Sequence, residues 1–260
     1  MRTVRLLISF DGGNYCGWQR QQNQPTIQGA VEEQLAVICN EEIVLHGAGR
    51  TDAGVHAYGM VAHFHTSSTV SCYNLLSGLN SRLHTTIRIL AVDDVPASFH
   101  ARKSATGKQY WYFFSCADVL VATRIPVVAH FPKLTHLERM RQCLPLLLGT
   151  HDFSSFEAVG SRDLTRTPGR GAVRTLTYVQ IETSDTRFPE EYKLILHGDG
   201  FLRKMVRNIA GTLFEVGLGR MSVADFAQVI KARDRHCAGP TAPACGLFLY
   251  CVNYDGVTTG

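Results

Sequence analysis

An acid and a base stand two positions apart in a segment with few bulky side chains, GAGRTDAGVHA, which runs from Gly47 to Ala57. Glycine-rich segments with Asp and Thr are ordinary loop material, and taken alone this segment favours a turn. The alternative is a catalytic loop, in which Arg50 and Asp52 act on a substrate that the glycines allow the backbone to approach. Other residues of the chain must decide between these two interpretations.

Two further stretches combine aromatic side chains with amide or basic groups that could contact a substrate. The first, DGGNYCGWQRQQN, is a turn-rich loop, and its Trp18 could equally fold back onto the core. The second, ATGKQYWYFF, places Lys108 and Tyr110 on one face of a strand and Trp111 on the other, because side chains alternate along a strand. Core packing is the more common fate of such aromatic residues.

Two stretches are rich in arginine. In GDGFLRKMVRNIAG, Arg203 and Arg207 lie four apart and share one helical face, which a solvated basic surface would also explain. In SRDLTRTPGRGAVRT an arginine recurs at every fourth residue: Arg162, Arg166, Arg170 and Arg174. Pro168 and the glycines beside it forbid a continuous helix there, so this stretch is expected to be a loop suited to phosphate contact.

Histidines raise the possibility of a metal site. His63 and His65 share one face of an expected strand, His46 and His56 are near in sequence, and Asp52 could supply a carboxylate. Catalytic zinc sites usually carry tighter signatures such as HExxH, which the chain lacks here. We therefore expect no metal, and keep a metal-dependent hydrolase as an alternative.

The composition is that of a folded soluble protein with a mild preference for anionic partners. Of 260 residues, 45% are hydrophobic and 18% charged, and the formal net charge is +4. Twenty of the 26 basic residues are arginine, which favours an RNA or nucleotide partner because arginine makes multidentate contacts with phosphate and bases. The eight cysteines show no CxxC spacing, and no signal-peptide core or membrane-length apolar run is present, so we expect a cytoplasmic protein with reduced cysteines.

The elements that must position these residues mix strands and helices without a strict βαβ rhythm. Alternating apolar residues predict strands at 4–10, 60–66, 87–92, 110–114, 176–182, 192–197 and 247–254. Helical spacing and capping residues predict helices at 27–38 after Thr26, 73–83, 137–148, 202–216 and 222–232, the last with a Ser222-x-x-Asp225 capping box. We therefore expect an α+β fold with two related lobes, 1–105 and 106–260, on a largely antiparallel mixed sheet flanked by helices, with a cleft between the lobes.

Seven blocks, taken together and in this order, resemble the TruA family of tRNA pseudouridine synthases: DGGNYCGWQRQ, PTIQGAVEEQL, GRTDAGVHA, FHARKSATGKQYWY, GTHDFSSF, GFLRKMVRN and TAPACGLFL. The similarity runs from about Leu7 to Tyr254, and GRTDAGVHA carries most of its specificity. The arginine-rich loop around Pro168 looks longer than the usual version in the family.

The resemblance implies an isomerase that converts uridine to pseudouridine at positions 38 to 40 of the tRNA anticodon stem-loop. This reaction involves no net redox change and no hydrolysis, so no cofactor is expected. By resemblance the protein acts as a homodimer with tRNA as its partner and does not bind a membrane. Chain length and the lack of appended tails favour the bacterial type of enzyme.

The resemblance also implies roles for particular residues. Asp52 is the catalytic carboxylate, which attacks either the base or the sugar, and Arg207 pairs with it. Tyr110 stacks on the target uracil, and Arg50 fills the space left by the extruded base. The remaining expected substrate contacts are Lys108, Leu247, Arg166, Arg170 and Arg174.

Three alternatives to this function remain open. A metal-dependent hydrolase would use His63, His65 and Asp52. A non-catalytic RNA-binding module would use the arginine-rich loop and the aromatic residues, and would have no need of Asp52. A related enzyme would act on another uridine in tRNA or small nuclear RNA.

Overall fold

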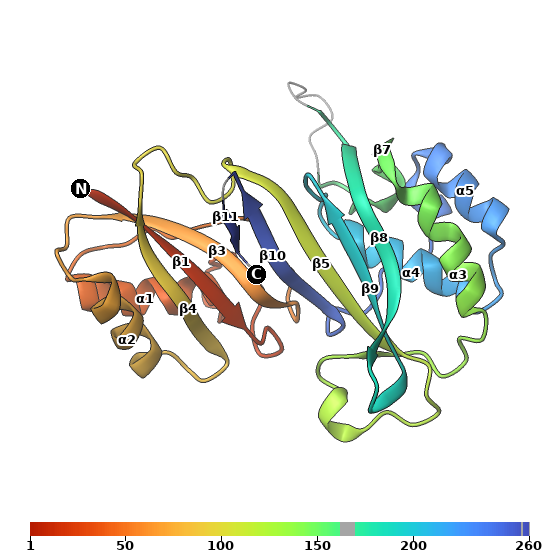
Figure 1. The fold of residues 1–260 in the computed structure, drawn as a ribbon, viewed down its shortest axis with the longest axis horizontal. Helices are drawn as coiled ribbons and strands as arrows, with labels where there is room; N and C mark the ends of the chain where they lie inside the picture. Colours follow the sequence, from red (N-terminus) through yellow and green to blue (C-terminus); the bar gives the residue numbers. More distant parts are fainter. Residues whose placement is uncertain (162–169, 256, 260) are drawn as a thin grey trace. The chain divides into compact units, whose positions relative to one another are not determined.

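The structure, a computed structural model, describes residues 1–161, 170–255 and 257–259. The chain divides into two compact units, one formed by Met1–Lys108 with Phe248–Gly260 and the other by Gln109–Leu247. Each unit joins a sheet to helices, so the α+β class predicted from the sequence is confirmed (Figure 1).

The first unit contains a sheet with the strand order β4–β1–β3–β10, to which β2 adds beside β3 and β11 beside β10. Its elements are β1 (Arg2–Phe10), α1 (Ile27–Cys39), β2 (His46–Gly47), β3 (His56–Thr66), α2 (Cys72–Arg82), β4 (Ile87–Val95), β10 (Leu247–Tyr254) and β11 (Val257–Thr259). The pairs β1–β3 and β1–β4 are antiparallel, whereas β10 joins β3 in parallel, with Phe248 opposite His56. This return of the chain to the first unit is a long-range pairing that the sequence pattern does not predict.

The core of the first unit follows from the alternation along β1. Val4, Leu6 and Ile8 are fully buried on one face of the sheet, and helices α1 and α2 lie together beside the strands (Figure 1). Thr26 caps α1 as predicted, since its side chain accepts a hydrogen bond from Gly29 N at 3.3 Å. Strand alternation and helix capping therefore act together to fix the face that carries the helices.

The second unit contains the strand order β5–β9–β8–β7 with β6 beside β5. Its elements are β5 (Ala105–Ser115), η1 (Ala122–Arg124), β6 (Ala129–His130), α3 (Leu137–Cys143), η2 (Leu144–Leu147), β7 (Gly149–Asp152), η3 (Ser154–Phe156), β8 (Val173–Asp185), β9 (Phe188–Gly198), α4 (Met205–Gly217), α5 (Val223–Ala232) and η4 (Arg235–Cys237). Helices α3, α4 and α5 pack against one another on the side of β8 and β7 (Figure 1). The pairs β8–β9 and β7–β8 are antiparallel.

Two helices of the second unit differ from the prediction. The expected helix 137–148 is α-helical only to Cys143 and continues as a 3-10 helix, because Pro145 cannot donate the next helical hydrogen bond. Helix α4 begins at Met205 rather than residue 202, since Lys204 has a left-handed backbone with φ of 62°. The capping box of α5 is present as predicted, with Ser222 and Asp225 bonded to each other's backbone.

Within the part of the chain that the structure describes, no helix has both the length and the apolar character needed to span a bilayer. All eight cysteines are free thiols.

Candidate active site

The segment that carries Asp52 is a tight turn between strands β2 and β3. Val55 N donates to Asp52 O at 3.2 Å, and Gly54 has a φ of 75°, a left-handed conformation that suits glycine. The Asp52 side chain is half-exposed, so the turn presents the carboxylate at the edge of the first unit rather than in its core.

A second loop, Asp11–Trp18, fixes the backbone of this turn. Trp18 N donates to Thr51 O at 3.2 Å, and Gly17, with φ of 91°, lies so near that a Cβ there would be 2.5 Å from Thr51 O. A Cβ at Gly12 would fall 2.0 Å from Val55 O. These glycines therefore allow two backbones to touch, which holds Asp52 in place from both sides.

Helix α1 in turn holds the second loop. The amides at the start of this helix would lack intrahelical partners, but Ile27 N donates to Gly17 O at 3.2 Å and Gln28 N to Trp18 O at 3.0 Å. The turn with Asp52 is thus connected to a rigid helix through two layers of backbone hydrogen bonds. This arrangement suits a group that must keep its position during a reaction.

His56, two residues after Gly54, closes the other end of the turn. Its Nδ1 lies 3.2 Å from Gly12 N and 3.0 Å from Asp11 Oδ1, and its ring stacks on Phe248 at 4.5 Å between centroids. An unprotonated Nδ1 accepts a hydrogen bond from Gly12 N, whereas a protonated Nδ1 donates one to Asp11 Oδ1. The side chain is only 1% exposed, so His56 acts as a buried clamp between the two loops and β10. Sequence reasoning considered it only as a possible metal ligand.

Lys108 also contacts the backbone before Asp52. Its Nζ donates to Ala48 O at 2.7 Å, and a Cβ at Gly49 would lie 3.2 Å from the same nitrogen. A Cβ at Gly47 would meet the Trp18 ring at 2.6 Å, and this ring is 2% exposed. The glycines of GAGRTDAG thus make room for the protein's own side chains, and Trp18 does fold back onto the core.

The second unit carries the predicted tyrosine on β5. Tyr110 is 8% exposed and packs edge-on against Phe201, with ring centroids 4.9 Å apart. Tyr112, two residues on, is fully buried and donates from its hydroxyl to Pro243 O at 2.9 Å. Burial raises the pKa of Tyr112 well above its usual value, which keeps that phenol neutral.

Arg207 projects from α4, where it is half-buried. Its Nε donates to Ala242 O at 2.8 Å, while Ala242 N donates to Arg207 O at 3.1 Å, so the guanidinium is tied to the segment before β10. Leu247, the first residue of β10, is 7% exposed. Three apolar residues of this helix are buried and anchor it in the core: Val206, Ile209 and Leu213.

The described part of the arginine-rich loop uses its cations within the protein. Arg170 forms an ion pair with Asp199, and Arg174 donates to Gly171 O at 2.9 Å and to Val173 O at 2.6 Å. Arg166 lies outside the described residues. The first unit thus brings together Arg50, Asp52 and Lys108, and the second carries Tyr110, Arg207 and Leu247; the expected ion pair of Asp52 with Arg207 stays a prediction.

The histidines form a cluster of rings. His63 lies at 5.2 Å from His46, 5.6 Å from His65 and 4.7 Å from His100 between ring centroids, and its Nδ1 accepts from Ala101 N at 3.2 Å. Burial, followed by the neighbouring imidazoles, lowers the pKa of His63 to about 4. Among the described residues, no three His, Cys, Asp or Glu side chains are grouped so that they could hold a metal ion.

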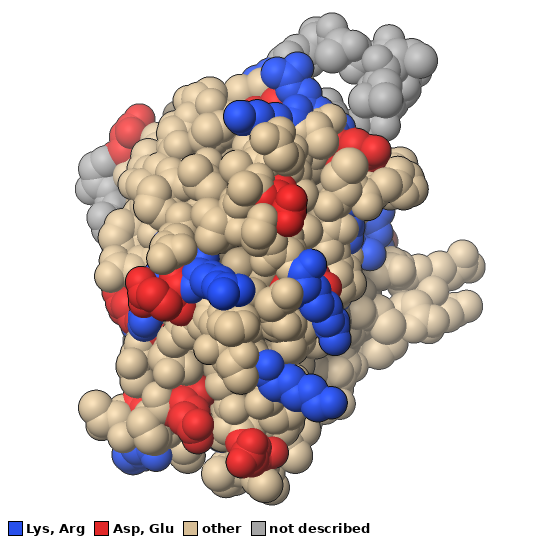
Figure 2. Space-filling view, turned by 90° about the vertical axis from the view of Figure 1, so that its right-hand side faces the viewer, with Lys and Arg blue, Asp and Glu red and all other residues tan. Residues whose placement is uncertain are grey.

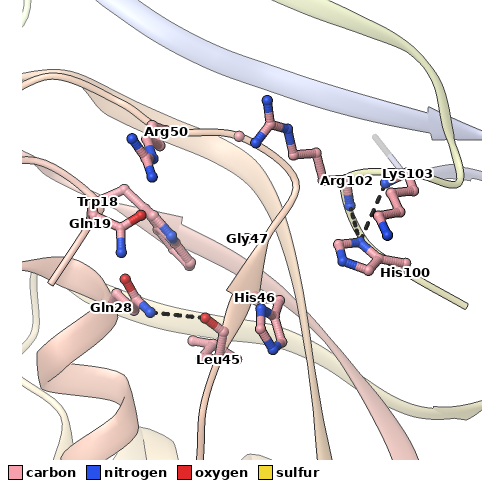
Figure 3. Close-up of a pocket in the computed structure, with 11 residues that line it drawn as sticks. Trp18, Gln19, Gln28, Leu45, His46, Gly47, Arg50, His100, Arg102 and Lys103 are labelled. Carbon is pink, nitrogen blue, oxygen red and sulfur yellow. Dashed lines mark hydrogen bonds between the residues drawn. The ribbon is translucent and has the colours of Figure 1, made fainter. Parts of the chain in front are cut away.

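Next to this cluster the first unit has a cavity of about 520 Å³ that sequence reasoning missed (Figure 3). Arg50 and Gln19 lie on one side of it, and Arg102, Lys103 and His100 on the other. The only sequence signal was the basic run in FHARK, which lies 50 residues beyond Arg50. On the side of the molecule where α5 lies, in contrast, charges of both signs are interspersed (Figure 2).

Comparison with known proteins identifies the family to which the chain belongs. The sequence profile of the family described as tRNA pseudouridine synthase matches residues 6–102 and 144–255. A protein of Desulfotalea psychrophila named tRNA pseudouridine synthase A 1 is 50% identical over 255 residues, which cover 98% of this chain and 100% of the relative. Proteins named tRNA pseudouridine synthase A from Acetivibrio thermocellus and Lysinibacillus sphaericus are 41% and 38% identical, each over 98% of this chain and 100% of the relative. The chain therefore belongs to the tRNA pseudouridine synthase family, and is an isomerase that acts on uridine in tRNA.

Proposed function

We propose that this isomerase modifies positions 38 to 40 of the tRNA anticodon stem-loop and that Asp52 is its nucleophile. The observation that carries the proposal is the double support of the Asp52 turn, by the Asp11–Trp18 loop and by Lys108. Asp52 carries the carboxylate of this turn, and its side chain is half-exposed.

The chemistry suits a fixed carboxylate. The bond from uracil N1 to ribose C1′ breaks, the base turns, and a bond from C5 to C1′ forms, while C5 loses a proton and N1 gains one. Atoms and electrons balance, so the reaction needs no oxidant, reductant or water. A covalent bond to the carboxylate of Asp52 would hold one fragment during the turn, as in retaining glycosidases.

The substrate base must leave the RNA stack to reach the carboxylate, because the glycosidic bond of a stacked, paired base is not accessible. Arg50, which is exposed and two residues before Asp52, would occupy the place of the extruded base. The ring of Tyr110 would stack on the uracil, and its edge-on contact with Phe201 would fix the ring plane. The guanidinium of Arg207 would keep Asp52 ionised.

Binding and assembly complete the proposal. The expected phosphate contacts are those of the arginine-rich loop: Arg166, Arg170 and Arg174. In this proposal Arg170 exchanges its partner Asp199 for a phosphate when RNA binds. Leu247 would contact the extruded base, and the enzyme would act as a homodimer in the cytoplasm without a cofactor.

The test is Asp52→Asn, which keeps the shape of the side chain and removes its charge. We expect pseudouridine formation to fall by more than a thousandfold, while the Kd for tRNA changes less than threefold, because RNA affinity comes mainly from basic side chains. Asp255→Asn, at an exposed carboxylate near the chain end, is the matched control and should keep full activity. Substantial turnover by the Asp52 variant would exclude it as the nucleophile.

The modified positions require a separate measurement. Pseudouridines are mapped in tRNA from cells with and without this protein, and again after adding the purified enzyme to the unmodified tRNA. Loss and recovery at positions 38 to 40 is the expected result. Loss at another uridine would support the related specificity instead and leave the role of Asp52 intact.

A further inference from the structure

The cavity beside the Asp52 turn has the size of a small-molecule site. Its volume of about 520 Å³ lies within the range of roughly 300 to 1,000 Å³ that is usual for ligand pockets. We call it the basic cavity and define it by Gln19, His46, Arg50, His100, Arg102 and Lys103 (Figure 3). All of these residues belong to the first unit.

The charge of the basic cavity has one sign. Arg50, Arg102 and Lys103 line it, and none of the described residues that line it is an aspartate or glutamate. All three cations are exposed, so a ligand can reach them from solvent. Arg20, by contrast, stands close by in sequence but forms an ion pair with the buried Glu32 at 3.2 Å. The cavity therefore favours an anion.

Hydrogen bonds fix its two sides. On one side, Gln28 donates to Glu32 Oε1 at 2.9 Å and to Leu45 O at 3.0 Å, and accepts from Arg20 N at 2.9 Å. Both N–H donors of this buried amide bond within the protein, so Gln28 serves to hold the wall in place. Gln19, which is exposed, keeps its amide toward the cavity (Figure 3).

On the other side, the His100 ring orders a short turn. Its Nδ1 accepts from Arg102 N at 3.2 Å and from Lys103 N at 3.3 Å. The neutral ring must therefore carry its proton on Nε2, which makes Nε2 a donor. The same two bonds fix the backbone from which the side chains of Arg102 and Lys103 extend. The cationic side of the cavity is thus preorganised.

We propose that the basic cavity binds a nucleotide that flanks the target uridine, with its phosphate against Arg102 and Lys103 and its base against Gln19 and His46. This inference rests on the proposed function, since it takes Asp52 as the place of reaction. Arg50 and Asp52 are two residues apart, so their Cα atoms are at most about 7 Å from each other, and the cavity that Arg50 lines is close to the Asp52 turn. Guanidinium and ammonium groups suit the phosphate, and amide and imidazole groups suit base edges.

The experiment combines a protein variant with a chemical change in the RNA. Arg102→Ala and Lys103→Ala are made together, and tRNA binding is measured at several salt concentrations. We expect the Kd to rise about tenfold and the slope of log affinity against log salt to fall by about 1 to 2, as for the loss of one or two phosphate contacts. The matched control, Lys133→Ala with Arg139→Ala, removes two exposed cations of the second unit and should change the Kd less than twofold.

The location is tested with synthetic tRNAs in which single phosphates around the target uridine are replaced by uncharged methylphosphonates. In the wild-type protein, one or two replacements beside the target should weaken binding, and the same replacements should have no further effect in the double variant. Equal effects in both proteins at every phosphate would overturn the proposal, as would loss of binding by the control to the same extent. Non-additivity only at phosphates far from the target would refute the flanking position.

These binding measurements do not depend on turnover. If the wild-type protein forms no pseudouridine at positions 38 to 40, the proposed function fails. The comparison of the two proteins with the two kinds of tRNA still reports whether the cavity holds a phosphate. Thermal unfolding of the double variant checks its fold, which we expect to be intact because both side chains are exposed.

Discussion

Lys108→Met separates two possible roles of this lysine, namely substrate binding, which the family resemblance implies, and support of the Asp52 turn. In the structure its Nζ donates to Ala48 O at 2.7 Å, in the backbone that leads to Asp52. Methionine keeps an unbranched side chain of similar length and removes the donor together with its positive charge. If Lys108 acts by holding the turn, the variant should bind tRNA normally and react slowly.

The magnitude follows from the environment of the carbonyl. A hydrogen bond from a charged donor contributes about 1.5–3 kcal/mol, and the lower end applies here because the Lys108 side chain is half-exposed. Ala48 is fully buried, so water replaces the lost donor poorly. If the whole of about 1.5 kcal/mol is needed to keep the turn in its reactive position, kcat falls about tenfold, since each 1.4 kcal/mol is a factor of ten.

The assay is the release of tritium from tRNA that carries tritiated uridine at C5, because the reaction expels the hydrogen of C5. Single-turnover rates and Kd are measured for the wild type, for Lys108→Met and for Lys231→Met, an exposed control on α5. The expected result is a rate loss of about tenfold with Kd unchanged. An unchanged rate with a weaker, less salt-dependent Kd would show that Lys108 binds phosphate and would refute this reasoning.

Three further predictions concern pH, metals and salt. His63 has a pKa of about 4 when folded and 6.5 when unfolded, so the unfolded chain binds more protons between these values, and stability is full above pH 6.5 and falls as pH drops toward 4. Between pH 7 and pH 4 this effect should lower the free energy of unfolding of the wild type by about 3 kcal/mol, measured by urea unfolding at both pH values. In His63→Asn, whose amide oxygen can still accept from Ala101 N, this part of the pH dependence should be absent. Activity should survive exhaustive EDTA treatment, because the isomerisation needs no oxidant, reductant or water. A loss of activity that added zinc restores would support the metal-dependent hydrolase instead. Neutralising Arg166, Arg170 and Arg174 together should lower the salt slope of tRNA binding by about 2, and an unchanged slope would place that loop away from RNA.

Local patterns predicted most elements of the fold. Strand alternation gave β1 and β10 nearly to their ends, and capping residues placed the starts of α1 and α5 at Thr26 and Ser222. The errors are local too, since Pro145 and the left-handed Lys204 ended or delayed helices whose apolar spacing continued. The pattern of apolar residues predicts which side chains are buried. A capping hydrogen bond can be predicted when its donor and acceptor lie within one helical turn in the sequence.

The support of the candidate site was not predictable in the same way. Gly17 and Thr51 are brought together by folding, and nothing in the residues between them specifies that contact. The same holds for Lys108 with Ala48, and for the basic cavity, whose cations come from two separate segments. The order and the identity of the motifs indicate the family. They do not indicate which side chains contact the backbone of the Asp52 turn.

The glycines of this chain have a more particular role than loop flexibility. Gly17 and Gly12 are placed where a side chain would strike Thr51 O or Val55 O, so they allow contact between two loops. Gly47 leaves room for the ring of Trp18. The result is a turn whose own residues are small but whose position is fixed by its neighbours. A carboxylate on such a turn can stay half-exposed and still be held in place, which a nucleophile that meets a large RNA requires.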